Sequence, residues 1–202
     1  MSKVLIINSS AAGTGSVSNT LIEAFRKDYA AHHPEASFVQ HDLGQTPLAP
    51  LSALNIQGFM GQAQESLSEI ALAQTSETLI AELEATDLLV IGAPMYNFGI
   101  TALLKTWFDY VLRAGRTFKY TESGPQGLLK NKKAIVVETR GGLYSEGPAQ
   151  SLDSQEPHIR TMLAFIGITD VEFVRAEKLA FGPEAKSGSI EAAQERLSAL
   201  AA

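Results

Sequence analysis

DLLVIGAPMYNFGITALLKTWFDYVLR, residues 87–113, predicts a buried strand, a polar loop and an amphipathic helix in direct succession. Leu88–Ile91 is apolar at every position, which is typical of a strand covered by helices on both faces, as in a parallel sheet. Pro94 lacks a backbone donor and Gly92 permits unusual angles, so the strand should end there. Apolar residues then recur at helical spacing from Leu103 to Leu112. We therefore expect a central strand whose loop forms one wall of a ligand site, although an ordinary connection packed by its own aromatic residues would look alike.

The composition limits the possible functions. The chain has 202 residues, of which 45% are hydrophobic and 19% charged, as in a soluble globular protein, and no apolar run approaches the length of a membrane span. Its start resembles no secretory signal, so we expect a cytoplasmic protein. With no cysteine, thiol and thiolate chemistry are excluded, and redox chemistry would need a bound cofactor. The net charge of −6 argues against nucleic-acid binding.

The rest of the chain alternates predicted strands and helices. Further strands are expected near 3–8, 38–43, 133–138 and 171–175, and helices near 18–29, 64–85, 158–166 and 190–200. This alternation predicts a single α/β domain over residues 1–202, with a doubly wound parallel sheet and helices on both faces. Residues 45–61 contain two prolines and two glycines without periodicity, so we expect a loop excursion that reaches over a ligand or a partner subunit; a plain surface loop is the alternative.

The loop after the first strand, Ser9–Asn19, is rich in hydroxyl groups and ends at a helix start. Helix N-termini and hydroxyl groups bind anions, so a phosphate could lie there. The loop lacks the Gly-Lys-Ser/Thr ending of a nucleoside-triphosphate loop, and Ser18 stands where the dinucleotide fingerprint has its third glycine. An open, flavodoxin-like loop for the phosphate of FMN remains, next to the simpler interpretation of a capped helix after a flexible loop.

Three loops should meet at one edge of the sheet. Loops 9–18, 94–98 and 139–142 each follow a buried strand, and the flavodoxin-like strand order 2-1-3-4-5 makes those three strands neighbours. The first loop offers a phosphate cradle, the second an aromatic wall with an amide, and the third two glycines that leave the backbone open to the polar edge of a ring. Together they predict an FMN site in a three-layer sandwich.

With these residues in view, the chain resembles the FMN-dependent NADH azoreductase and quinone reductase family. The resemblance extends over nearly the whole chain and is carried by Ser2–Leu5 with the serine loop, Ala93–Phe98, Arg113–Gly115, Thr117–Glu122, Gly127–Leu128, Lys132–Ile135, Arg140–Gly142 and Phe165–Val171. It implies cofactor contacts from Ser10, Ser16, Val17, Ser18, Met95, Tyr96, Asn97, Phe98, Thr139, Arg140, Gly141 and Gly142. It also implies a homodimer, with Phe118, Tyr120 and the 45–61 excursion as candidates for lining the substrate site.

The resemblance implies an enzyme that takes hydride from NADH and passes two electrons to quinones or azo compounds by a ping-pong mechanism. The flavin carries the chemistry and water can supply protons, so we name no catalytic residue. The four histidines show no metal-ligand spacing, and we expect no metal site. The alternative function is a flavodoxin-type electron carrier, which also binds FMN but has no small-molecule substrate.

Overall fold

The computed structural model describes residues 2–59 and 66–202, and its centre is a five-stranded parallel sheet. The strands are β1 (Lys3–Asn8), β2 (Ser37–Asp42), β3 (Leu88–Pro94), β6 (Lys133–Thr139) and β7 (Asp170–Ala176). Their order is β2-β1-β3-β6-β7, with β3 in the middle. This confirms the predicted order 2-1-3-4-5 and the central position of the strand predicted at Leu88–Ile91.

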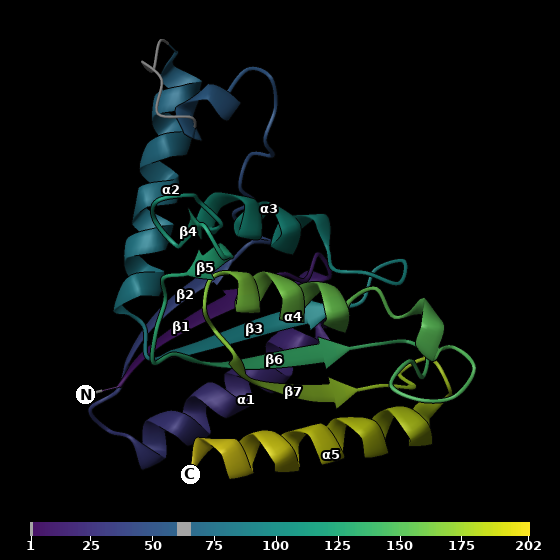
Figure 1. Cartoon of the computed structure of the whole chain (residues 1–202). Helices are drawn as coiled ribbons and strands as arrows, with labels where there is room; N and C mark the ends of the chain where they lie inside the picture. The colour runs from purple at the N-terminus through teal and green to yellow at the C-terminus, as the bar shows by residue number, and fades with distance from the viewer. Residues whose placement is uncertain (1, 60–65) are drawn as a thin grey trace.

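Helices cover both faces of the sheet and complete three layers (Figure 1). The helices α1 (Val17–His32) and α5 (Pro183–Ala201) lie on one face. The other face is covered by α2 (Leu67–Ala85), α3 (Ala102–Val111) and α4 (Glu156–Phe165). Part of α2 extends beyond the sheet, and so does the short 3₁₀ helix Ile56–Phe59 (Figure 1).

Strand β3 is buried along its whole length because its side chains enter two separate cores. Leu89, Ile91 and Ala93 belong to the core under α2, α3 and α4, whereas Leu88 and Val90 belong to the core that includes α1 and α5. An unbroken apolar run is what a strand with two covered faces requires.

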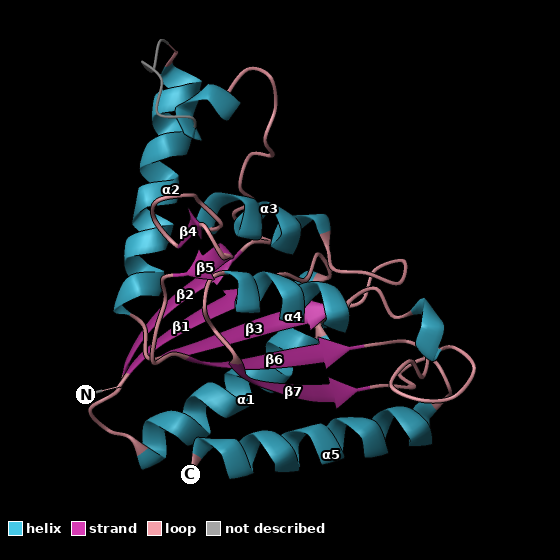
Figure 2. Cartoon of the chain, in the orientation of Figure 1, coloured by secondary structure: helices cyan, strands magenta, loops and turns pink. Residues whose placement is uncertain are grey.

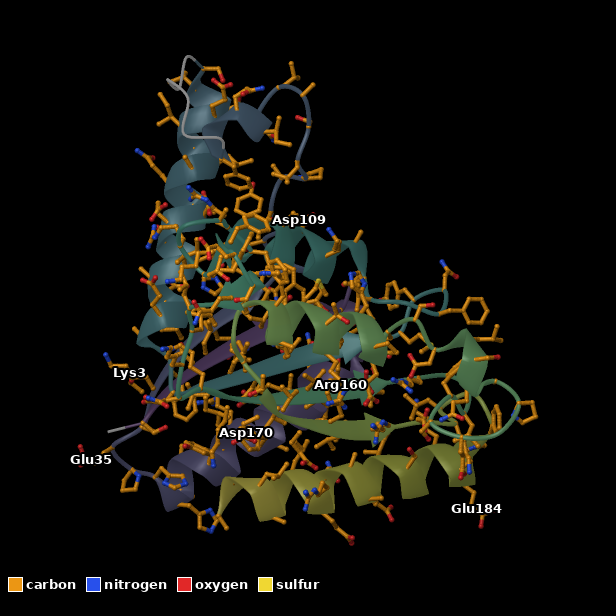
Figure 3. The ribbon with its side chains drawn as sticks, in the orientation of Figure 1. Lys3, Glu35, Asp109, Arg160, Asp170 and Glu184 are labelled. Atoms are coloured by element: carbon orange, nitrogen blue, oxygen red, sulfur yellow. The ribbon has the colours of Figure 1, made fainter. Side chains whose placement is uncertain are left out.

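Asp87 connects the amino ends of three neighbouring strands. Its carboxylate accepts a hydrogen bond of 2.8 Å from the N–H of Lys3, and its own N–H donates to the carbonyl of Lys3 over 2.9 Å. Its carbonyl accepts from the N–H of Lys133 at 3.1 Å. Figure 3 shows Lys3 at this edge, opposite the ends from which the candidate loops emerge.

The segment after α3 differs from the prediction. None of the predicted strands falls there, whereas β4 (Phe118–Thr121) and β5 (Gly124–Gly127) pair as an antiparallel hairpin (Figure 2). Gly127 lies directly against the backbone of Gly167, where an added Cβ would come within 2.2 Å of the Gly167 nitrogen. The hairpin is therefore seated by a contact that only glycine allows.

The predicted 45–61 excursion is described up to residue 59 and includes a short 3₁₀ helix, Ile56–Phe59. The phenol of Tyr110 on α3 donates to the carbonyl of Ala49 over 2.9 Å, which attaches the excursion to the body. Residues 60 and 61 and the expected helix start at Gln64 lie outside the described residues. In the part of the chain that the structure describes, no helix has the length and hydropathy needed to cross a membrane.

Candidate functional site

The carboxyl ends of β1, β3 and β6 bring the three predicted loops together. The strands are direct neighbours, with Asn8 opposite Gly92 and Pro94 opposite Thr139. Two hydrogen bonds join the loops themselves: the N–H of Ala11 donates to the phenol oxygen of Tyr96 over 3.2 Å, and the N–H of Met95 donates to the carbonyl of Thr139 over 2.9 Å. The fold thus assembles one composite site from segments far apart in the sequence.

The serine loop forms the first wall. Ser16 caps α1 by accepting a hydrogen bond of 3.1 Å from the N–H of Asn19, and its hydroxyl lies 3.1 Å from that of Ser18. Ser10, Ser16 and Ser18 are buried. Val17 and Ser18 belong to the first turn, whose N–H groups have no acceptor within a helix. Hydroxyl groups, free N–H groups and the positive end of the helix dipole are the components of an anion site.

The second wall is a tight turn with unusual backbone angles. Tyr96 and Gly99 exchange two backbone hydrogen bonds, of 3.0 and 3.2 Å, and the residues between them, Asn97 and Phe98, have φ of 49° and 72°. Positive φ at both central positions is the geometry of a type I′ turn, which is unfavourable for a bulky residue such as phenylalanine. The exposed side chains of Tyr96, Asn97 and Phe98 are thereby presented at the sheet edge.

The third wall is the backbone after β6. The carbonyls of Gly141 and Gly142 accept hydrogen bonds from the N–H groups of Ala180 and Lys178, at 3.0 and 2.8 Å, so the segment after β7 holds this loop. At Gly142 a Cβ would lie 3.0 Å from the ring of Tyr144. Because Gly141 and Gly142 have no side chains, their backbone stays accessible and the ring of Tyr144 can pack closely against Gly142.

Arg140 has partners that the sequence did not reveal. Its guanidinium is fully buried and lies 2.7 Å from Glu138, 3.0 Å from Asp153 and 3.2 Å from Glu177. Its Nε donates to the side-chain oxygen of Gln155 over 2.9 Å, and its backbone N–H donates to a carbonyl of β7. Through these contacts the side chain of Arg140 supports the loop. The predicted contact between Arg140 and a cofactor stays a prediction.

The carboxylates around Arg140 have different proton affinities. Burial raises the pKa of Glu138 to about 7, although the Arg140 guanidinium acts in the opposite direction. Burial also acts to raise the pKa of Glu177, but hydrogen bonds from the Ser145 hydroxyl and the Tyr144 N–H outweigh it and lower that pKa. The cluster therefore holds one carboxyl that titrates near neutral pH inside the protein.

The two residues predicted to line the substrate site differ in exposure. Phe118 is buried, with its ring centroid 4.5 Å from that of Phe165, while Tyr120 is 73% exposed. Sequence reasoning missed Tyr144, whose ring meets Phe98 edge-on at 6.2 Å. It also missed Gln155, because neither residue stands in a strand-end pattern that would single it out.

The comparisons with known proteins agree with this geometry. The model of a family described as having a flavodoxin-like fold matches residues 2–201. The chain is 48% identical to an FMN-dependent NADH:quinone oxidoreductase of Hyphomonas neptunium, covering 100% of this chain and 96% of that protein. It is 46% identical to one of Azotobacter vinelandii, with both chains fully covered.

Solved structures with the same fold include an azoreductase from Bacillus anthracis strain Sterne, at a TM-score of 0.90 and 33% identity over 100% of this chain and 99% of that one. An FMN-dependent NADH-azoreductase from Bacillus anthracis strain Ames Ancestor, solved in complex with FMN, has a TM-score of 0.88 and 26% identity over 100% of both chains.

Proposed function

The chain belongs to the flavodoxin-like fold family, and from that membership and the geometry of its site we propose an FMN-dependent NADH oxidoreductase that reduces quinones and azo compounds. The observation that carries the proposal is the meeting of three loops: a serine-lined helix N-terminus, an exposed aromatic turn and a glycine backbone at one sheet edge. Relatives at 46–48% identity over the whole chain are named FMN-dependent NADH:quinone oxidoreductases, and a solved structure at 33% identity is named an azoreductase.

The serine loop fits a phosphate monoester. Ser10, Ser16 and Ser18 supply buried hydroxyl groups, and Val17 and Ser18 supply N–H groups of the first helical turn. This donor set needs no lysine or arginine, because the helix dipole and several hydrogen bonds stabilise the charge.

The other two loops fit a planar heterocycle. Met95, Tyr96, Asn97 and Phe98 would supply apolar contacts and an amide, and Thr139, Gly141 and Gly142 would supply a hydroxyl and backbone groups. A bound FMN would supply hydride transfer from NADH and the delivery of two electrons to a quinone or an azo compound. The chain's own residues bind the cofactor, orient it and leave one side open to flat substrates; no side chain of the site is required as a general acid.

We also propose that the protein is a cytoplasmic homodimer whose subunit boundary lies near the substrate site. Large apolar side chains are exposed on the excursion and the start of α2, with Leu54 80% and Leu67 86% accessible, and Tyr120 is exposed on the hairpin. A second copy covering these residues would explain their exposure. Light scattering during size-exclusion chromatography tests the proposal, since a monomer at micromolar concentration would contradict it.

One experiment separates an enzyme from an electron carrier. The purified protein, loaded with FMN, is mixed with NADH in the absence of oxygen while visible absorbance is recorded. We expect rapid bleaching, followed by recovery when a quinone is added. A protein that keeps its colour until a separate reductase is supplied would act as a carrier, and a protein that does not retain FMN at all would refute the site.

A further inference from the structure

Gln155 is fully buried and connects two of the three loops through one side chain. Its Nε2 donates to the carbonyl of Ala93 over 2.7 Å, and its Oε1 accepts from the Nε of Arg140 over 2.9 Å. Ala93 comes directly before Pro94 and the aromatic turn, and Arg140 comes directly before Gly141. The amide of Gln155 thus joins the end of β3 to the loop after β6.

The segment that carries Gln155 also holds the aromatic turn directly. The N–H of Ser154 donates to the carbonyl of Phe98 over 3.0 Å. Asp153 lies 3.0 Å from the guanidinium of Arg140 through one carboxylate oxygen, and its other oxygen accepts from the N–H of Gln155 over 2.8 Å. Residues 153–155 therefore form a bracket that is fixed to Arg140 on one side and to Phe98 on the other.

We propose that Gln155 is a positioning residue that keeps the Tyr96–Gly99 turn in its left-handed conformation, ready for the flavin ring, with Arg140 as the anchor of the bracket. The inference rests on the proposed function, since it assumes that the turn contacts FMN. A phenylalanine in the left-handed region persists only where its surroundings fix it. Without the bracket the free protein spends less time in the binding conformation, and the apparent affinity for FMN falls by that fraction.

The two hydrogen bonds explain why the residue is a glutamine. The Ala93 carbonyl needs a donor and the Nε of Arg140 needs an acceptor, and a side-chain amide supplies both. Glutamate supplies an acceptor only, unless it is protonated. Methionine has nearly the shape of glutamine, but it has no hydrogen-bond donor and its sulfur is only a weak acceptor.

The test compares Gln155→Met and Gln155→Glu with Gln194→Met, a matched change at an exposed position of α5. Apoprotein is titrated with FMN to obtain Kd, the visible circular dichroism of the bound flavin is recorded, and the Tm of each apoprotein is measured. We expect Gln155→Met to weaken FMN binding about tenfold, which corresponds in free energy to roughly one hydrogen bond, and to change the dichroism of the bound ring. Gln194→Met should match the unsubstituted protein.

The pH dependence of FMN binding by Gln155→Glu is a measurement that a purely structural role of Gln155 would leave unchanged. The affinity of Gln155→Glu relative to the unsubstituted protein should improve as the pH falls, because the protonated acid regains a donor for Ala93. The charged and titratable groups around this position are Arg140 and Glu138 on the β6 side, Arg175 and Glu177 on the β7 side, and Asp153 and Glu156 on its own segment. The FMN phosphate titrates in the same way in both experiments, so its effect cancels in the ratio of the two Kd values at each pH.

Two results would overturn the proposal. One is Kd and dichroism of Gln155→Met within about twofold of the control. The other is a lower affinity that follows only a lower apoprotein Tm, with no pH response in Gln155→Glu. Failure of the unsubstituted protein to bind FMN would refute the proposed function instead, so the two failures are distinguishable.

Discussion

Replacing Glu138 by glutamine should change how the stability of the protein depends on pH. Glu138 is fully buried on β6, one of its oxygens accepts from Arg140 over 2.7 Å, and the other has no hydrogen-bond partner among the described residues. Burial is the main reason that its pKa rises from an ordinary value of 4.5 to about 7. Glutamine keeps the acceptor for Arg140 and is neutral at every pH.

The sign and size of the effect follow from proton linkage. Between pH 4.5 and about 7 the folded protein holds a proton on Glu138 that the unfolded chain has released, so the free energy of unfolding falls as the pH rises through this window. Above about pH 7 the loss is complete. The difference between the two pKa values, at 1.36 kcal/mol for each pH unit, is about 3 kcal/mol at most. Glu138→Gln lacks this decline.

Urea unfolding of the flavin-free proteins at a series of pH values from 4.5 to 8 measures the effect. The free energy of unfolding of Glu138→Gln minus that of the unsubstituted protein should increase by up to about 3 kcal/mol over this range. Other titrating groups are common to both proteins and cancel in the difference. Glu195→Gln, an exposed change on α5, should give a difference that stays flat. A flat difference for Glu138→Gln as well would show that Glu138 does not hold a proton in the folded protein at neutral pH.

Four further changes test the site and the fold. Ser18→Asp places a carboxylate beside the proposed phosphate and should abolish retention of FMN, as absorbance of the purified protein will show; normal flavin content would remove the loop from the site. Asn97→Ala should weaken FMN binding by roughly tenfold, from the lost amide and the positive φ, whereas Asn97→Gly relieves the backbone and should recover part of the affinity in the same titration. Tyr120→Ala should change the ranking of quinone and azo acceptors by kcat/KM while leaving flavin content nearly unchanged, because the side chain is exposed and lies outside the three loops; equal effects on all acceptors would place it away from substrate. Gly127→Ala should destabilise the protein by about 2 kcal/mol or more in urea unfolding, since the Cβ would overlap the Gly167 backbone; a loss below about 0.5 kcal/mol would show that the hairpin shifts freely.

Regular elements were predictable from sequence because their patterns are local. The apolar run of β3, the stripe of α3 and the serine loop each contain the information that fixes them. Their alternation predicted a doubly wound sheet, and the strand order came from the flavodoxin-like layout. The hairpin β4–β5 was missed because its strands have four residues each and one consists of glycine, proline and glutamine, which show no alternation of apolar and polar side chains.

The environment of Arg140 could not be read from its neighbours in the chain. Its partners Asp153, Gln155 and Glu177 are separated from it by between 13 and 37 residues and meet it only when loops after different strands fold together. The resemblance implies a cofactor contact for Arg140, which stays a prediction. The structure adds that its side chain is a charge taken out of water and balanced by carboxylates, and no local sequence pattern indicates such an environment.

Because β3 is apolar at every position from Leu88 to Ile91, burial alone does not fix its alignment with the neighbouring strands. If this strand slid by one residue, Leu89 and Ile91 would exchange sides with Leu88 and Val90, and both cores would still receive aliphatic groups, so burial alone distinguishes poorly between the two alignments. Asp87 removes the ambiguity between β3 and β1, because its carboxylate accepts a hydrogen bond from the N–H of Lys3, and a strand shifted by one residue would lose this side-chain bond. A carboxylate at the far end of the strands thereby sets how β3 aligns with β1, and with it the height at which the loops after these two strands meet.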